Sequence, residues 1–542
     1  MDGLHPPSDK DALLSSPRED GGYVLTTVNQ YPSSAVGEDW RGALIEETSA
    51  FRADVEQFGD FHTLLWDADR EQTLDVREDA ADSDVSYESP RVPEAHVDNE
   101  FAFEDGAEAS LSQDVLVSLD RPALLVRNRV SFEEGGERTI FSVLNSSIQS
   151  GGEESADDET ANAMYERSLT SLKCAQDPSG GTIAGAFEPD DQGYRFVWPR
   201  DQVFIVAAML AGDAVEEARR ALSWLDGKQI TDDVVDDRDI SREGTWWQNY
   251  RSDGDPNWTA LQLDQVGGPI YAHWLLWKET DEDEDALEEH YGMSESAAEF
   301  LLGYDNGDGF PGKSQDPWEE VWGHSTEGSA ASIAGLRAMA EMAEARGDDG
   351  FADDCRETAA TWAERFNDYC FREDAYLGDH YVTADSPEGD DSVAPDERPD
   401  AAAFMATWPW NVVDADSDEM RSTVELATDP AWCADDAACV GRYPEDDFTP
   451  SGSVEDGGWP ICEAFADAVR WLDGDGDALR KYVFEDAPTW TSATGLLPEQ
   501  IRGDGSVRWN CNLQWSQAMY VLLAESHARG EPFGMAPGAD AA

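Results

Sequence analysis

The sequence predicts a mainly α-helical protein, an (α/α)6 barrel preceded by a small β-sandwich-like N-terminal domain. Two observations lead to this prediction. Up to about residue 150, apolar and polar residues alternate with a period of two, which is typical of half-buried strands. From about residue 160, apolar residues recur with helical spacing in twelve segments, the number needed for six helical hairpins. We therefore expect the β domain over residues 1–150 and the barrel over residues 155–535.

The first region contains five predicted strands, separated by clusters of Asp, Gly and Pro. They cover residues 22–30, 61–66, 73–77, 123–132 and 138–144. The segment over residues 146–159 is rich in small and acidic residues, which favours a linker.

Twelve helices are predicted after the linker. They cover residues 160–175, 200–211, 214–226, 259–278, 285–303, 327–346, 350–369, 399–411, 416–428, 459–472, 476–487 and 512–528. The segment over 200–211 is apolar on nearly every side and is therefore expected inside the barrel. The segment over 350–369 alternates Ala, Trp362 and Phe366 with charged residues, which is typical of an outer helix.

The chain has 542 residues and a large excess of acidic side chains, with 116 Asp and Glu, 37 Lys and Arg, and a formal net charge of −79. The acids are spread along the whole chain between apolar runs. Repulsion of this size destabilises a compact fold at low ionic strength, and molar salt screens it within a few ångströms. We therefore expect a halophilic surface. The same charge argues against binding to nucleic acid, because no basic patch can release counterions from phosphates.

No run of about 18 apolar residues occurs, so no membrane span is expected. The stretch MDGLHPPSDKDALLSS lacks the apolar region of a secretory signal, and a cytoplasmic location is expected. Cys433 and Cys439 are close enough in sequence to pair, but free thiols are favoured in a reducing compartment. Asp473, Asp475 and Asp477 are spaced as in a calcium loop but lack its Gly and Glu, which favours a turn at a helix end. No metal or organic cofactor is expected.

Two loops between predicted helices combine acidic and aromatic residues. The first contains Asp316-Pro317-Trp318-Glu319-Glu320-Val321-Trp322-Gly323, and the second contains Leu497-Pro498-Glu499-Gln500. An apolar wall and a neighbouring negative charge both raise the pKa of a carboxyl group, which keeps it protonated near neutral pH. The first loop therefore favours a proton-donating carboxyl of the kind that glycosidases use. The alternative is an acidic loop in an acidic protein.

Five motifs follow one another along the predicted barrel. They are Tyr194-Arg195-Phe196-Val197-Trp198-Pro199-Arg200-Asp201, the Trp318-Glu319-Glu320 loop, Gly441-Arg442-Tyr443-Pro444-Glu445-Asp446 with Trp459-Pro460 after it, Pro498-Glu499-Gln500, and Leu513-Gln514-Trp515-Ser516-Gln517-Ala518. In residue types and order, this set resembles glycoside hydrolase family fifteen, the glucoamylase and glucodextranase family. The resemblance extends over about residues 170–528, with each motif at a loop between helices of the expected barrel.

The resemblance implies a role for particular residues of these motifs. The first Glu of the Trp-Glu-Glu motif, Glu319, would be the catalytic general acid, and Glu499 would be the general base. Arg200 and Asp201 would hold the sugar in the subsite before the scissile bond. Further implied substrate-binding residues are Glu320 and Arg442, together with Tyr194, Trp198, Trp318, Trp459 and Trp515, which would line the pocket.

These residue types suit hydrolysis of a glycosidic bond with inversion. Glu319 could give a proton to the leaving oxygen, while an ionised Glu499 could take one from the attacking water. The resemblance implies an α-glucan or maltodextrin as substrate and β-D-glucose as product. The alternatives are a glucodextranase or an α,α-trehalase of the same family, or a non-catalytic glucan-binding protein. The presence of both carboxyls as Glu argues against the last of these.

The implied site residues also have purely structural interpretations. Arg200 and Asp201 could form an ion pair at a helix start, and Arg442 could pair with Asp446 or Glu445. Trp198 and Trp515 could belong to the barrel core. A separate alternative is that Glu320, and not Glu319, is the acid. The chain also departs from the family in two places. Its N-terminal β region is shorter than in bacterial-type members, and the segment over 246–264 resembles the family only loosely, so we assign that segment no role beyond a pocket wall.

Overall fold

The computed structural model describes most of the chain from residue 158 onward and the strands of the region before it. The described residues are 12–15, 24–31, 42–50, 58–67, 72–75, 80–89, 92–103, 107–117, 124–132, 138–145, 158–185, 194–232, 234–251, 254–375, 377–388, 396–429, 439–444, 446, 448, 457–492, 495–502, 507–508, 510 and 512–539. The chain divides into two compact units. One contains residues 1–154, 176–178 and 492–495, and the other contains residues 155–175, 179–491 and 496–542.

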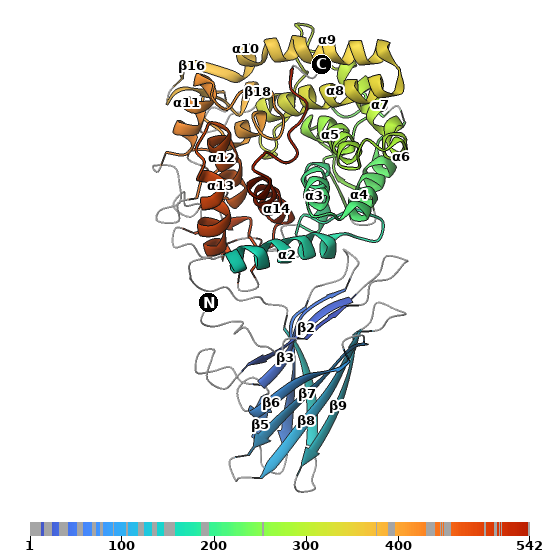
Figure 1. The fold of residues 1–542 in the computed structure, drawn as a ribbon, viewed down its shortest axis with the longest axis vertical. Helices are drawn as coiled ribbons and strands as arrows, with labels where there is room; N and C mark the ends of the chain where they lie inside the picture. Colours follow the sequence, from blue (N-terminus) through green and yellow to red (C-terminus); the bar gives the residue numbers. More distant parts are fainter. Residues whose placement is uncertain are drawn as a thin grey trace. The chain divides into compact units, whose positions relative to one another are not determined.

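The smaller unit is built from two antiparallel sheets (Figure 1). The first contains β1 (Ala12–Ser15), β2 (Val24–Tyr31), β3 (Gly42–Ala50), β4 (Phe58–Asp67), β5 (Gln72–Asp75) and β10 (Arg138–Asn145). The second contains β6 (Ala80–Ser89), β7 (Val92–Ala102), β8 (Glu108–Val117) and β9 (Leu124–Phe132). Strands β1–β3 contact β6–β8, so the sheets pack on one another as a sandwich.

The five strands predicted from the sequence correspond to β2, β4, β5, β9 and β10, while β1, β3, β6, β7 and β8 were not predicted. Strand β7 explains the omission, because polar residues occur on both of its faces. Val97 and Phe101 are buried, but Asn99 between them is buried as well. An inward-facing amide breaks the apolar alternation that identifies a half-buried strand.

The larger unit is an (α/α)6 barrel, as predicted. Six segments contact one another in a closed ring and form its inner layer (Figure 1). They are α3 (Pro199–Ala211), α5 (Asp264–Glu279), α8 (Thr326–Arg346), the 3₁₀ helix η1 (Ala401–Ala406), α12 (Pro460–Leu472) and α14 (Gln514–Arg529). Every residue of α3 is buried, in agreement with its uniformly apolar sequence.

The outer layer alternates with the inner one along the chain. Its helices are α2 (Asp158–Ala175), α4 (Val215–Lys228), α6 (Glu284–Glu289), α7 (Tyr291–Gly303), α9 (Asp349–Glu364), α10 (Phe366–Cys370), α11 (Asp418–Ala427) and α13 (Ala478–Lys481). Helix α9 buries only one stripe, which includes Ala352, Cys355, Ala359 and Trp362, as an outer helix should. None of the helices in the described residues is both long enough and apolar enough to cross a membrane.

Four of the predicted helices were wrong in detail. The segment over 350–369 is divided at Arg365 into α9 and α10. The segment predicted over 399–411 contains only the six-residue 3₁₀ helix η1, because Pro409 lacks an N–H and its ring clashes with the preceding turn of an α-helix. The segment over 285–303 is divided at His290 into α6 and α7. The segment over 476–487 forms α13, a π-helical turn η3 (Tyr482–Asp486) and the start of the 3₁₀ helix η4 (Ala487–Trp490).

Short strands hold the loops at one end of the barrel, and none was predicted because each has only two to five residues. One sheet joins β11 (Phe196–Val197), β12 (Asn249–Arg251) and β13 (Pro256–Trp258), and a second joins β14 (Ser314–Gln315), β15 (Trp322–Ser325) and β18 (Ala384–Glu388). Two hairpins are β16 (Phe371–Ala375) with β17 (Gly378–Tyr381), and β19 (Gln500–Ile501) with β20 (Val507–Arg508).

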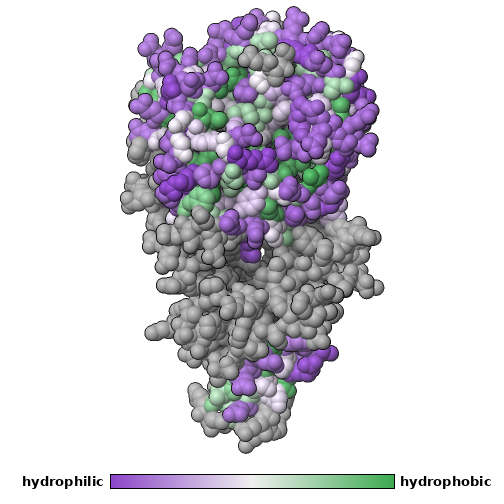
Figure 2. Space-filling view, viewed as in Figure 1, coloured by the Kyte–Doolittle hydropathy of each residue, from purple (hydrophilic) through white to green (hydrophobic). Residues whose placement is uncertain are grey.

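The described surface of the barrel is mainly hydrophilic on the face drawn in Figure 2. Only three large hydrophobic residues are exposed in the described part of the chain: Val235, Trp258 and Phe448. Asp473 and Asp475 lie in the turn between α12 and α13, where Asp473 accepts hydrogen bonds from Arg421. Cys433 lies outside the described residues, so the expectation that Cys433 and Cys439 are thiols and do not pair remains a prediction.

Candidate active site

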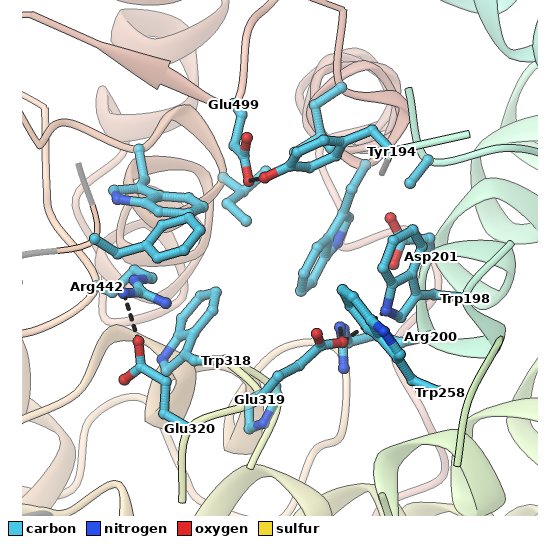
Figure 3. Close-up of a pocket in the computed structure, with 17 residues that line it drawn as sticks. Tyr194, Trp198, Arg200, Asp201, Trp258, Trp318, Glu319, Glu320, Arg442 and Glu499 are labelled. Carbon is cyan, nitrogen blue, oxygen red and sulfur yellow. Dashed lines mark hydrogen bonds and ion pairs between the residues drawn. The ribbon is translucent and has the colours of Figure 1, made fainter. Parts of the chain in front are cut away.

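All eleven residues that the sequence singled out as site residues line one pocket of about 290 Å³ at the loop end of the barrel (Figure 3). They belong to the five motifs named above, one of which contributes both Arg442 and Trp459. Figure 3 shows Glu319 and Glu499 on opposite sides of this pocket. The other lining residues are Ala184, Trp258, Pro317, Phe448, Ile461 and Leu513.

The backbone that carries Glu319 is organised by the carboxyl group of Asp316. The Oδ1 atom of Asp316 accepts hydrogen bonds from the backbone N–H groups of Glu320 (2.8 Å) and Val321 (2.6 Å), and its Oδ2 atom accepts one from Trp318 (3.2 Å). Asp316 is completely buried, and burial raises its pKa to about 7 against the effect of these N–H groups. The tight turn places Glu319 at φ 70°, in the left-handed region that non-glycine residues seldom occupy.

The side chain of Glu319 is held from one side only. Its Oε1 atom accepts a hydrogen bond from Nε1 of Trp198 at 2.6 Å and a longer one from Nη2 of Arg200 at 3.5 Å. Both donors come from the start of α3, which follows β11. Because both contacts fall on Oε1, a proton carried by this carboxyl would reside on Oε2.

Arg200 is held by a segment that the sequence analysis treated as a pocket wall. Its Nη1 atom donates to Oδ2 of Asp264 at 3.2 Å and to Oε1 of Gln262 at 3.3 Å. The ion pairs of Arg200 are therefore with Asp264 and Glu319 and not with its neighbour Asp201. Asp201 is buried beside the pocket, and burial raises its pKa to about 7.

Glu499 lies in a drier environment than Glu319. It is 5% exposed, and its Oε1 atom accepts a hydrogen bond from the hydroxyl of Tyr194 at 2.7 Å. Its Oε2 atom is buried and has no hydrogen-bond partner among the described residues. Burial raises the pKa of Glu499 to about 8, although the Tyr194 hydroxyl and the charge of Arg442 act in the opposite direction.

Glu320 points away from Glu319 and toward Arg442 (Figure 3). Its Oε1 atom accepts a hydrogen bond from Nη2 of Arg442 at 2.8 Å, and its Oε2 atom accepts one from the hydroxyl of Tyr443. Arg442 also donates to both carboxylate oxygens of Asp446, at 2.7 Å from Nε and from Nη2. The structural pairing considered for Arg442 is thus present, and it coexists with a place in the pocket wall.

The aromatic wall of the pocket is continuous with the barrel core. The rings of Trp318 and Trp459 lie 6.0 Å apart, and those of Trp318 and Trp515 lie 6.5 Å apart. Trp515 also packs on Phe204 of α3 at 5.2 Å, so it serves both core and pocket. The Nε1 atoms of Trp459 and Trp515 are buried and have no acceptor among the described residues, which leaves two N–H donors available at the site.

The sequence analysis missed Phe448 and the contact of Asp264 with Arg200, and it assigned Trp258 to the pocket wall only as part of the segment over 246–264. Trp258 and Phe448 line the pocket and are 44% and 40% exposed. The only signal for them was an aromatic residue in an otherwise polar loop. The contact of Asp264 was missed because its partner Arg200 is 64 residues away in the chain.

Two glucoamylases are among the solved structures with a similar fold. A crystal structure of a bacterial glucoamylase complexed with acarbose matches with a TM-score of 0.66 at 17% identity, covering 99% of this chain and 97% of the other. The glucoamylase of Saccharomycopsis fibuligera matches with a TM-score of 0.54 at 15% identity, covering 70% of this chain and 98% of the other. At these identities the likeness describes the fold.

The family follows from the sequence match. The model of glycosyl hydrolases family 15 matches residues 159–466, more than half of the chain. The chain therefore belongs to glycosyl hydrolase family 15, as its motifs predicted.

Two curated relatives match over part of their length. A glucoamylase of Clostridium sp. (strain G0005) is 30% identical over 234 residues, which are 41% of this chain and 30% of the relative. An uncharacterized glycosyl hydrolase of Methanocaldococcus jannaschii is 26% identical over 380 residues, 66% of this chain and 55% of the relative. The chain thus spans about a third and about half of these relatives.

Proposed function

We propose that the protein is an inverting, exo-acting hydrolase that releases β-D-glucose from the ends of α-glucans, in the manner of a glucan 1,4-α-glucosidase. One observation carries this proposal: Glu319 and Glu499, from loops 180 positions apart in the sequence (499 − 319), face each other across one aromatic-lined pocket (Figure 3). Inverting hydrolysis needs two carboxyls on opposite faces of one sugar ring.

In this mechanism Glu319 is the general acid. Its proton, on Oε2, passes to the glycosidic oxygen as the bond from that oxygen to the anomeric carbon breaks. Trp198 and Arg200 hold Oε1 and so fix the direction in which Oε2 points. The leaving sugar departs as a neutral alcohol.

Glu499 is the general base. It takes a proton from the water that attacks the anomeric carbon on the face opposite the leaving group, so the α linkage gives a β product. Burial raises the pKa of Glu499 to about 8, so the base is ionised in only part of the molecules at neutral pH. The hydroxyl of Tyr194 stabilises the ionised form, since it donates to Oε1.

Two groups of polar residues on opposite sides of the carboxyl pair suit the two sugars next to the scissile bond. Arg200 and Asp201 lie on one side of the line between Glu319 and Glu499, and Arg442 and Glu320 lie on the other (Figure 3). We assign the first group to the glucose that is released. The second group then faces the sugar of the leaving group.

The experiment is hydrolysis of maltose, isomaltose and trehalose in molar KCl, with the anomer of the released glucose followed by NMR. We expect β-D-glucose, with maltose as the best of the three substrates. Preference for isomaltose would indicate a glucodextranase, and preference for trehalose a trehalase. Release of α-D-glucose would contradict inversion, and no release from any α-glucan would leave a glucan-binding protein. The halophilic surface and the cytoplasmic location remain predictions.

A further inference from the structure

A second guanidinium, that of Arg398, lies behind Glu320 and outside the pocket. Arg398 is 4% exposed and is not one of the residues that line the pocket. Its Nη2 atom lies 3.5 Å from Oε2 of Glu320, on the carboxylate oxygen opposite the one that Arg442 contacts. Glu320 is thus held between two arginines, one in the pocket wall and one behind it.

The remaining contacts of Arg398 fix its own position. Its Nε atom donates to Oγ1 of Thr383 at 2.9 Å, and its guanidinium carbon lies 3.5 Å from the centre of the Tyr443 ring. A guanidinium stacked on an aromatic ring loses little freedom when it binds a carboxylate, because its planar fork is already oriented. The Nη2 atom of Arg398 is buried and makes no hydrogen bond among the described residues. Its polar interaction with these residues is the ion pair with Glu320.

The same arginine is connected to an aromatic ring of the pocket. Thr383, which accepts from Arg398, donates to Oδ2 of Asp400 at 2.6 Å. Oδ1 of Asp400 in turn accepts from Nε1 of Trp318 at 2.9 Å. Arg398 therefore contacts the Tyr443 ring and Glu320 directly, the latter on the side of the pocket assigned to the leaving group. It is linked to Trp318 through three hydrogen bonds, by way of Thr383 and Asp400.

We propose that Arg398 is a positioning residue for the leaving-group side of the pocket: it holds Glu320 and Tyr443 in the orientation that receives a second sugar. This inference rests on the proposed function. The proposed role of Arg398 differs from that of Arg200 and Asp201, which line the opposite side of the pocket. Loss of Arg398 should therefore impair substrates whose leaving group is a sugar and spare substrates whose leaving group is small.

The test compares maltose with α-D-glucosyl fluoride, whose leaving group makes no sugar contacts. For R398Q we expect kcat/KM on maltose to fall roughly 10- to 100-fold, because misplacement of binding groups has effects of that size. On the fluoride we expect a change of less than about threefold, since the contacts of Arg200 and Asp201 are intact. R337Q is the matched control, because Arg337 is a buried arginine that donates to the carbonyl of Asn411 away from the pocket.

A double-mutant cycle shows whether Arg398 acts through Glu320. On maltose, the R398Q/E320Q double variant should be no worse than E320Q alone, because the two changes remove one interaction. If R398Q does not fold, as judged by circular dichroism in molar KCl, R398K takes its place with a smaller selective loss expected, because Lys keeps the charge and loses the fork.

The outcomes are distinguishable. Equal loss on both substrates, no loss on either, or additive effects in the cycle would overturn the role of Arg398. Wild-type protein that hydrolyses neither maltose nor the fluoride would overturn the proposed function, and this inference with it.

Discussion

The two glutamates that face each other across the pocket are held in different ways. Glu319 is half-buried, sits on a left-handed turn and receives two N–H donors on one oxygen. Glu499 is buried, receives one hydroxyl and keeps an oxygen without a partner in the described structure. Hydrogen bonds therefore fix the orientation of the Glu319 carboxyl, whereas desolvation raises the pKa of the Glu499 carboxyl. The difference suits a group that must give a proton in one direction and a group that must be made basic.

The largest effect should come from removing either carboxyl. E319Q and E499Q should each lower kcat on maltose by about 10²–10⁴-fold. α-D-Glucosyl fluoride distinguishes the two roles, because fluoride leaves without protonation. E319Q should keep most of its activity on the fluoride, and E499Q should lose it. The opposite pattern would show that Glu499 is the acid and Glu319 the base. E388Q, which removes a carboxylate from an exposed ion pair, serves as the control.

A smaller effect is expected from the hydroxyl that contacts Glu499. Y194F removes a donor to the carboxylate, so the pKa of Glu499 should rise further above about 8. Activity requires the ionised base, so the acidic limb of kcat/KM should move to higher pH by about one unit, the size expected for one hydrogen bond to a charged group. W198F removes a donor from the other carboxyl and should leave this limb in place. If the acidic limb of the pH profile moved equally in Y194F and W198F, the assignment of Glu499 as the base would be contradicted.

The smallest effect concerns stability. The folded-state pKa of Glu499 is raised, so the stability that its neutral form contributes is complete below about pH 4.5 and is lost as the pH rises through about 8. The amide in E499Q does not titrate. The free energy of unfolding of this variant should therefore exceed that of the wild type by a few kcal/mol between pH 5 and pH 9. Thermal midpoints in molar KCl measure this. E319Q, at the less buried carboxyl, is the matched control, and an equal gain in both variants would show that burial of Glu499 is not the cause.

The sequence predicted the barrel better than its details. Uniformly apolar segments such as α3 were recognised because an inner helix is buried on every side. The 3₁₀ helix η1 was not, because Pro409 lies within an otherwise helical pattern and its effect depends on how the neighbouring turns pack. Strands β7 and β8 were missed because inward polar residues, such as Asn99 and Gln113, interrupt their alternation.

The site was predicted from the motifs and not from the chemistry of single residues. A raised pKa was expected in the loop over 316–323, and there it belongs to Asp316, which orders the turn. The raised pKa of Glu499 was not foreseen, because the desolvation of this carboxyl depends on which distant segments pack around it. The contacts of Arg200 with Asp264 and of Glu320 with Arg398 likewise join distant parts of the chain.

Helices α5 and α8 touch at two glycines, and this contact has a consequence for the width of the binding cavity. A Cβ atom on Gly335 would lie 2.7 Å from the Cα atom of Gly267, and one on Gly267 would overlap the carbonyl oxygen of Ala331. Helix α5 begins with the carboxylate that grips Arg200, and α8 directly follows the strand after the Glu319 turn. The distance between the Arg200 side and the Glu319 side of the pocket therefore depends on two side chains that are absent, because a methyl group at either glycine would force α5 and α8 apart.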